Sequence, residues 1–206
     1  MTPYRLRQEA QMARFLAWKD AQGGLELPVT LHTLLKPDQQ GRISWLATQA
    51  LPPVLEVGTS WGMVLAYIDV RSPHEANTGV DIASWNVDLA RLLCPHLRIE
   101  LADARSLPFA DREFKTVVLA EILEHLMFPD DVRKAVEEAK RVASTRILVT
   151  LPNADADMDE AMTPKHAWAP DSHSVRKVLD MFEAVWEIRI DNLAPFFRIQ
   201  ADRRSH

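Results

Sequence analysis

Three acidic residues, Glu56, Asp81 and Asp103, end or nearly end short apolar runs that are separated by helix-sized intervals. Glu56 stands two positions before Gly58, where its carboxylate would repel a pyrophosphate and attract an ammonium group. Asp81 can accept both hydroxyls of a ribose. Asp103 can accept from an exocyclic amine such as adenine N6, because ionised carboxylates act only as acceptors. The three residues therefore predict a site for a nucleoside that carries a positively charged end.

The stretch PVLEVGTSWG, residues 53–62, predicts the unit that positions the first of these acids. Its apolar residues, Val54, Leu55 and Val57, are typical of a short strand buried on both faces of a parallel sheet. Gly58 and Gly62 permit a tight turn and close packing. The apolar run that follows, from residue 63 to residue 68, predicts a helix. A strand, a glycine turn and a helix open a nucleotide-binding α/β domain.

Further apolar runs predict the rest of the sheet. Because successive parallel strands need a helix-sized crossover, the acids at their ends should meet at one sheet edge. The predicted strands are 78–82, 97–101, 115–120 and 146–151, followed by a hairpin-like pair at 184–190 and 195–201. Helices are predicted over residues 4–18, 43–51 and 85–93, the last with Ser84 or Asn86 as its cap. Asp130 is the expected N-cap of the helix that carries Val132 and Val136.

Two motifs resemble a known enzyme family. The pattern E-x-G-x-x-x-G at residues 56–62 resembles motif I of the class I S-adenosylmethionine (SAM)-dependent methyltransferases, with Ser60 where a further glycine is usual. The segments ADARSLPFADREF (102–114) and VVLAEILEHL (117–126) resemble the small-molecule, type 11 group that includes ubiquinone- and menaquinone-biosynthesis enzymes. The resemblance covers roughly residues 53–153. It implies SAM as the cofactor and S-adenosylhomocysteine as the product.

The resemblance also implies a fold: one Rossmann-like α/β domain with a mainly parallel seven-stranded sheet, an antiparallel edge strand and helices on both faces. On this interpretation residues 1–206 form a single methyltransferase domain. Residues 53–153 are its SAM-binding core, and 154–206 supply an acceptor-side loop, a helix and the C-terminal strand pair. Residues 1–50 form a helical segment that either packs on the sheet or covers the cofactor as a lid, and the sequence favours neither.

The implied cofactor residues fall into groups that correspond to parts of SAM. The methionine end would lie against the glycine loop, the nucleoside against the second and third strands, and the sulfonium beside the fourth strand. The residues are Glu56, Gly58, Thr59, Ser60 and Gly62 for the methionine end; Asp81 and Ile82 for the ribose and one face of adenine; Asp103 and Ala104 for the adenine edge; and Ala120, Glu121 and Ile122 for the sulfonium side.

Histidines are the candidate catalytic bases. SAM carries an activated methyl, so only a weakly acidic acceptor such as an alcohol or phenol needs a base. His125, expected to begin the helix after the fourth strand, and His166, in a loop expected to face the acceptor, could each serve. Either could instead be a structural residue, and His173 is better explained as part of a helix cap. Glu124 could belong to the same cluster or hold the strand–helix junction.

The favoured function is methyl transfer to a small-molecule acceptor, with oxygen as the preferred acceptor atom. One alternative is a non-catalytic SAM-binding or regulatory subunit, because no residue is an unambiguous base. A weaker alternative is an NAD-binding oxidoreductase of the same architecture, which the carboxylate of Glu56 disfavours.

Composition narrows the function classes. The formal net charge of −5, with no run of Lys and Arg, disfavours a nucleic-acid partner. No apolar stretch has the length of a membrane span, and residues 1–20 lack the apolar core of a signal peptide.

The single cysteine, Cys94, cannot form an internal disulfide and fits the cytoplasm. The acidic segment 154–160 lacks the glycine and glutamate of a calcium loop, so no metal is expected. We expect a monomer or a homodimer.

Overall fold

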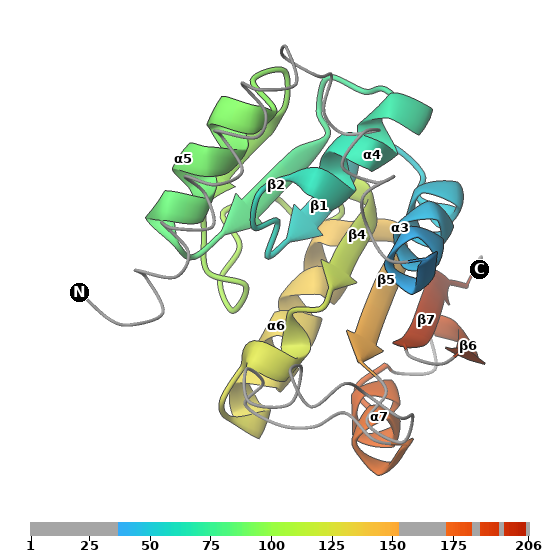
Figure 1. Ribbon diagram of the computed structural model, residues 1–206. Coiled ribbons are helices and arrows are strands. Elements are labelled where there is room, and N and C mark those ends of the chain that lie inside the picture. The colour runs from blue at the N-terminus through green and yellow to red at the C-terminus, as the bar shows by residue number, and fades with distance from the viewer. Residues whose placement is uncertain (1–36, 153–171, 183–185, 194–195, 205–206) are drawn as a thin grey trace.

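The computed structural model describes residues 37–152, 172–182, 186–193 and 196–204 (Figure 1). In these ranges the chain forms a seven-stranded sheet with the order β3-β2-β1-β4-β5-β7-β6. The strands are β1 (Val54–Val57), β2 (Thr78–Asp81), β3 (Arg98–Leu101), β4 (Phe114–Ala120), β5 (Ala143–Pro152), β6 (Trp186–Leu193) and β7 (Phe196–Arg203).

Strands β1 to β5 are parallel to one another, whereas β7 is antiparallel to both β5 and β6. The predicted strand pair forms an antiparallel hairpin in which Trp186 pairs with Arg203. The second strand of this hairpin joins the sheet beside β5, so β6 becomes the outermost strand. The mainly parallel seven-stranded sheet with antiparallel pairing at one edge is thereby confirmed.

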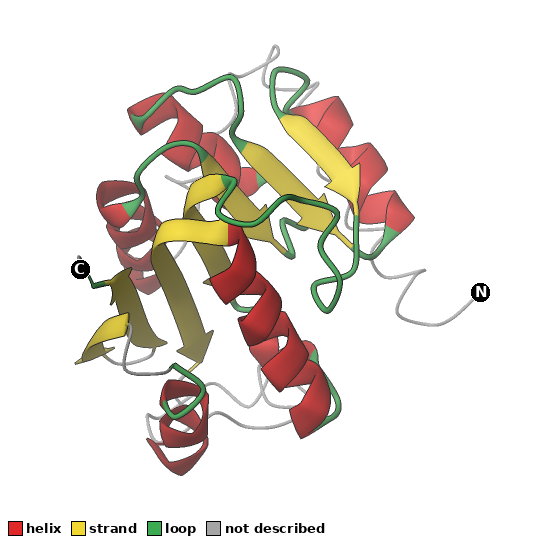
Figure 2. Cartoon of the chain, turned by 180° about the vertical axis from the view of Figure 1, so that it is seen from behind, coloured by secondary structure: helices red, strands yellow, loops and turns green. Residues whose placement is uncertain are grey.

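Helices cover both faces of the sheet. One face carries α3 (Pro37–Gln49), α4 (Met63–Arg71) and α5 (Ser84–Leu93), and the other carries α6 (Pro129–Val142) and α7 (Ser172–Leu179). Figure 2 shows α6 lying along the sheet on this second face. A short 3-10 helix, η1 (Leu123–His125), connects β4 towards α6.

Two apolar cores follow from the alternation of side chains along the central strands. Val117 faces the core beneath α6, and its neighbour Val118 faces the core beneath α3, α4 and α5. In β5, Ile147 faces the core beneath α6 and Leu148 faces the core on the other side of the sheet. All four side chains are fully buried. Strands buried on both faces explain why these runs are continuously apolar in the sequence.

Helix α3 packs against α4 and the sheet through Ile43 and Leu46, which are fully buried. It begins at Pro37, earlier than the helix predicted from Ile43. Proline suits the first turn of a helix, because its missing N–H would have no partner there. The helix predicted over residues 4–18 lies outside the described residues, so the lid role of the N-terminal segment stays a prediction.

The start of α6 differs from the predicted one. Asp130 was the expected N-cap, but Phe128 occupies that position in an extended conformation and Pro129 is the first helical residue. Asp130 and Asp131 lie in the first turn, where negative charge is favoured by the helix dipole. Among the described residues no helix has both the length and the apolar character needed to cross a membrane.

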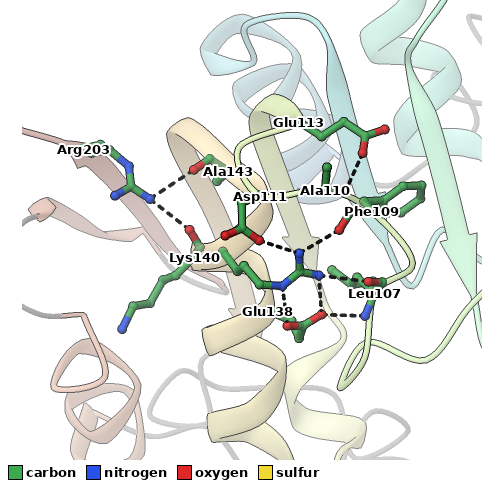
Figure 3. A network of polar contacts seen from close by, with 10 residues as sticks. Leu107, Phe109, Ala110, Asp111, Glu113, Glu138, Lys140, Ala143 and Arg203 are labelled. Carbon is green, nitrogen blue, oxygen red and sulfur yellow. Dashed lines mark hydrogen bonds and ion pairs between the residues drawn. The ribbon is translucent and has the colours of Figure 1, made fainter.

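The loop from β3 to β4 is bound to α6 by one guanidinium. Arg141 donates to the carbonyls of Leu107 (2.9 Å) and Phe109 (2.7 Å) and to the carboxylates of Asp111 (2.9 Å) and Glu138 (2.7 and 2.8 Å). Figure 3 shows these loop groups gathered on the helix. Glu138 also accepts from the N–H of Leu107 (2.7 Å). The loop that carries Asp103 at its start therefore has a fixed course.

Candidate active site

The strand order reverses between β1 and β4, and a pocket of about 800 Å³ opens at the carboxyl ends of the strands there. Open α/β sheets bind ligands at such a switch point. Of the predicted cofactor residues, all but Gly62 line this pocket, and so does His125. The residues it brings together are Glu56, Gly58, Thr59, Ser60, Asp81, Ile82, Asp103, Ala104, Ala120, Glu121 and Ile122.

Glu56 is a buried acid at the end of β1, with 2% of its surface exposed. One carboxyl oxygen, Oε2, accepts from the Thr59 hydroxyl (2.8 Å) and from the N–H of Leu65 (3.0 Å). Burial raises the pKa of Glu56 to about 8, against an ordinary value of 4.5. A cation placed beside it would favour the ionised form, so the site is suited to an ammonium group.

The glycine loop has left-handed backbone angles at Gly58 (φ 76°), Ser60 (φ 50°) and Gly62 (φ 80°). A Cβ on Gly58 would come within 2.6 Å of Cδ1 of Ile122, so this position needs a glycine. Ser60 adopts a conformation that glycine would adopt without strain, which explains why a glycine is usual there. Gly62 is the N-cap of α4, and a Cβ at this position would lie 3.4 Å from Sγ of Cys94. Its predicted cofactor contact stays a prediction.

Asp81 connects the glycine loop to α5. Its carboxylate accepts from the N–H groups of Ser60 and Ala83 (both 2.9 Å) and from the side-chain amide of Asn86 (3.2 Å). Ser84 and Asn86 were the expected caps of α5, but its N-cap is Ala83, with no side-chain cap. Part of the capping role therefore falls to Asp81, while its position in the pocket still allows contact with a ribose.

Asp103 is paired with a residue that the sequence did not single out. Arg105 donates to both of its carboxylate oxygens, the shortest contact being 2.7 Å, and also reaches Asp131 of α6 at 3.2 Å. The hydrogen bond from Arg105 lowers the pKa of Asp103. This bridge joins the β3 and α6 sides of the pocket, and an adenine amine would share the Asp103 carboxylate with Arg105.

Comparison with known proteins agrees with this geometry. Residues 54–145 match the family model described as a methyltransferase domain. A demethylmenaquinone methyltransferase from Thermotoga maritima is 29% identical over 89 residues, which are 43% of this chain. The match covers only 38% of that relative's length.

Solved structures share the fold at low identity. The PH0226 protein from Pyrococcus horikoshii superposes with a TM-score of 0.63 over 82% of this chain and 92% of its own, at 14% identity. A SAM-dependent methyltransferase from Aquifex aeolicus has a TM-score of 0.58 over 82% of this chain and all of its own (100%), at 18% identity.

Residues 54–145 therefore match a methyltransferase domain. The resemblance to SAM-dependent methyltransferases of the type 11 kind is confirmed, and the cofactor of that class is SAM. The methyltransferase domain brings a buried acid, a glycine loop and two further strand-end acids to one pocket, and this donor set fits a nucleoside with a cationic end. Which atom of SAM each residue contacts stays a prediction.

The end of β4 forms the opposite wall of the methyltransferase pocket. Glu121 has a left-handed backbone (φ 53°), and its N–H donates to the carbonyl of Thr150 (3.1 Å). Strain of this kind is often found at functional sites. Glu124 is fully buried, and its carboxyl oxygens have no hydrogen-bond partner among the described residues. Burial raises the pKa of Glu121, and burial together with the nearby Glu121 raises the pKa of Glu124.

His125 lies on the pocket wall. The sequence predicted that it begins a helix, and this prediction is wrong. His125 ends the 3-10 turn η1, and α6 starts only at Pro129. The extended backbone of Phe128 and the proline after it separate the two helices. His166 and the acidic segment 154–160 lie outside the described residues. His173 falls within α7, after its first residue.

Several pocket residues were missed because their neighbours in space are distant in sequence. Arg42 reaches the pocket from α3, and Trp85 and Asn86 reach it from α5. Trp61, which follows Ser60 in the glycine loop, also lines the cavity. In the part of the chain that the structure describes, no cluster of three or more His, Cys, Asp or Glu side chains could hold a metal ion.

Proposed function

We propose that the protein transfers a methyl group from SAM to a small-molecule acceptor, with oxygen as the acceptor atom. The observation that carries the proposal is the convergence of Glu56, Asp81 and Asp103 on one pocket at the switch point of a methyltransferase domain. These acids come from the ends of three neighbouring strands, and each has chemistry suited to a different part of one molecule.

In this proposal the chain's own residues bind and orient the cofactor. Glu56 holds the ammonium of the methionine end, and the backbone from Gly58 to Ser60 follows that end. Asp81 accepts from the ribose, and Asp103 from the adenine amine. Ile82, whose surface is 65% exposed, is available to pack against the adenine ring. SAM supplies the electrophilic methyl, so the protein's task is to position the acceptor and exclude water.

His125 is the proposed proton acceptor within the described residues. It lies on the pocket wall beyond the end of β4, three residues after Ile122. Methylation of an alcohol or phenol requires removal of a proton, and a neutral imidazole can take it near neutral pH. His166 remains a second candidate. A cytoplasmic location, the absence of a nucleic-acid partner and a monomeric or homodimeric state remain predictions from the sequence.

Two measurements test the proposal. Calorimetric titration with SAM, S-adenosylhomocysteine and NAD should show binding of the first two and none of NAD. Incubation with methyl-labelled SAM and a metabolite extract should then yield a labelled small molecule whose NMR methyl shift shows attachment to oxygen. Binding of NAD alone would contradict the proposal in favour of an oxidoreductase. Binding of SAM with no labelled product would assign the alternative role of a non-catalytic SAM-binding subunit.

A further inference from the structure

Arg42 is a cationic pocket residue that comes from outside the family-matched segment. It lies on α3, twelve positions before residue 54, where the methyltransferase match begins. Its side chain is 12% exposed and lines the same pocket as Glu56 and Glu121. A guanidinium removed from water needs partners for its five N–H donors, because unpaired buried polar groups are costly.

The described partners of Arg42 leave these donors largely unused. Nη1 lies 3.9 Å from Oε1 of Glu121, well beyond the 2.7–2.9 Å of a charge-assisted hydrogen bond. Nε is buried without a hydrogen-bond partner among the described residues. The guanidinium carbon lies 5.1 Å from the ring centre of Phe196, a contact that orients the group without using its N–H donors.

The nearby acids do not supply a firmly ionised partner. Burial raises the pKa of Glu56, Glu121 and Glu124, and the charge of Arg42 only partly opposes this effect at each of them. A simple structural counterion would be expected at hydrogen-bond distance from one carboxylate. The long separation from Glu121 leaves Arg42 able to attract an anion that enters the pocket.

We propose that Arg42 binds the α-carboxylate of the cofactor's methionine end, while Glu56 takes the ammonium of the same group. This inference rests on the proposed function and extends it to a specific subsite. A planar guanidinium can hold a carboxylate with two parallel hydrogen bonds. A carboxylate and a guanidinium in one pocket are complementary to a zwitterion, whereas a phosphate would be repelled by Glu56 once that residue is ionised.

The test compares ligands that differ in this one group. Calorimetry measures binding of S-adenosylhomocysteine, which has the carboxylate, and of 5′-methylthioadenosine, which lacks the whole amino-acid end. Arg42→Gln should weaken binding of S-adenosylhomocysteine about 10-fold to 100-fold, the range for hydrogen bonds to a charged group, and leave methylthioadenosine within about two-fold. Arg133→Gln, on the exposed side of α6 and outside the pocket lining, is the matched control and should change neither.

A second comparison needs no variant. The wild-type protein should bind SAM more tightly than decarboxylated SAM, which keeps the ammonium and the sulfonium but lacks the carboxylate. Equal affinity for these two ligands would overturn the Arg42 assignment, as would an equal loss of both nucleosides in Arg42→Gln. A wild-type protein that binds neither S-adenosylhomocysteine nor methylthioadenosine would instead overturn the proposed function, and the subsite with it.

Discussion

Glu56 shows how a single buried carboxyl can link ligand binding to pH. Two donors, the Thr59 hydroxyl and the N–H of Leu65, converge on one of its oxygens, yet burial outweighs them and raises its pKa to about 8. The neutral acid is therefore preferred in the folded protein without ligand. A cofactor ammonium bound beside it, as proposed above, would reverse this preference by stabilising the carboxylate.

The raised pKa of Glu56 predicts a pH-dependent loss of stability. The unfolded chain releases this proton near pH 4.5 and the folded chain only near pH 8. The contribution of the protonated Glu56 carboxyl to the free energy of unfolding is therefore complete below pH 4.5. It is lost as the pH rises towards 8, by up to about 1.4 kcal/mol per pH unit. Urea unfolding at several pH values should show the wild type losing free energy of unfolding relative to Glu56→Gln over this window. Parallel curves for the two proteins would contradict the prediction.

Asp81 predicts a loss of cofactor affinity on substitution. Asp81→Ala removes the proposed acceptor for a ribose and also the acceptor for the N–H of Ser60 in the glycine loop. We expect binding of S-adenosylhomocysteine to weaken by about 1–3 kcal/mol, since each hydrogen bond contributes about 0.5–1.5 kcal/mol. Calorimetry provides the measurement, and Asp81→Asn, which keeps one acceptor oxygen, should fall between the two proteins. Unchanged affinity in Asp81→Ala would refute the ribose assignment.

At the scale of elements, the loop from β3 to β4 depends on α6 for its course. Arg141 holds the loop on α6 by donating to two loop carbonyls and two carboxylates. At the end of the sheet Arg203 of β7 donates to the carbonyls of Lys140 and Ala143, so the C-terminus of α6 is held from both sides (Figure 3). The side of the pocket formed by Asp103 is thus positioned by contacts remote from it.

Arg141→Gln should destabilise the fold more than a matched change on the same helix. It leaves the carbonyls of Leu107 and Phe109 and the Glu138 carboxylate short of donors, which should lower the free energy of unfolding by about 1–3 kcal/mol. Arg133→Gln removes only exposed ion pairs with Asp130 and Glu137 and should have little effect. Urea denaturation compares the two variants, and equal midpoints would argue against the loop-anchoring role.

For the whole molecule, the sheet combines segments distant in sequence into one binding wall. The described pocket residues extend from Arg42 to Asp131, and they meet because the carboxyl ends of β1 to β4 lie at one edge. The hairpin of β6 and β7 extends the opposite side of the sheet and supplies Phe196 beneath Arg42. Ligand binding should therefore affect several separated segments together.

Hydrogen–deuterium exchange with and without S-adenosylhomocysteine tests whether one ligand protects these separated segments together. A ligand that binds only the native pocket should slow exchange around it, because local opening then costs additional free energy. We expect slower exchange at residues 58–62, 81–86, 102–105 and 121–125. Strand β6, at the far edge, should change little. Protection confined to a single one of these segments would show that the ligand does not occupy the shared pocket.

The central part of the fold could be predicted from local patterns. Apolar runs, helix-sized spacings and Gly58 indicated the β1 turn and the parallel strands, and the parallel arrangement placed Glu56, Asp81 and Asp103 at one edge. The predicted ends of helices were less accurate than the predicted strands. His125 and Asp130 were assigned to helix starts, but the extended Phe128 moved the start of α6 to Pro129.

The sequence by itself determined the fold class, the strand-end acids and the methyltransferase resemblance, because these depend on residue type and short-range spacing. Only the tertiary structure decided that Arg105 joins Asp103 to Asp131, that Ile122 closes on Gly58 and that Arg42 enters the pocket. Apart from the short link of Asp103 to Arg105, these contacts join residues that lie 26 or more positions apart in the sequence. Their partners are selected by packing, which no local pattern records.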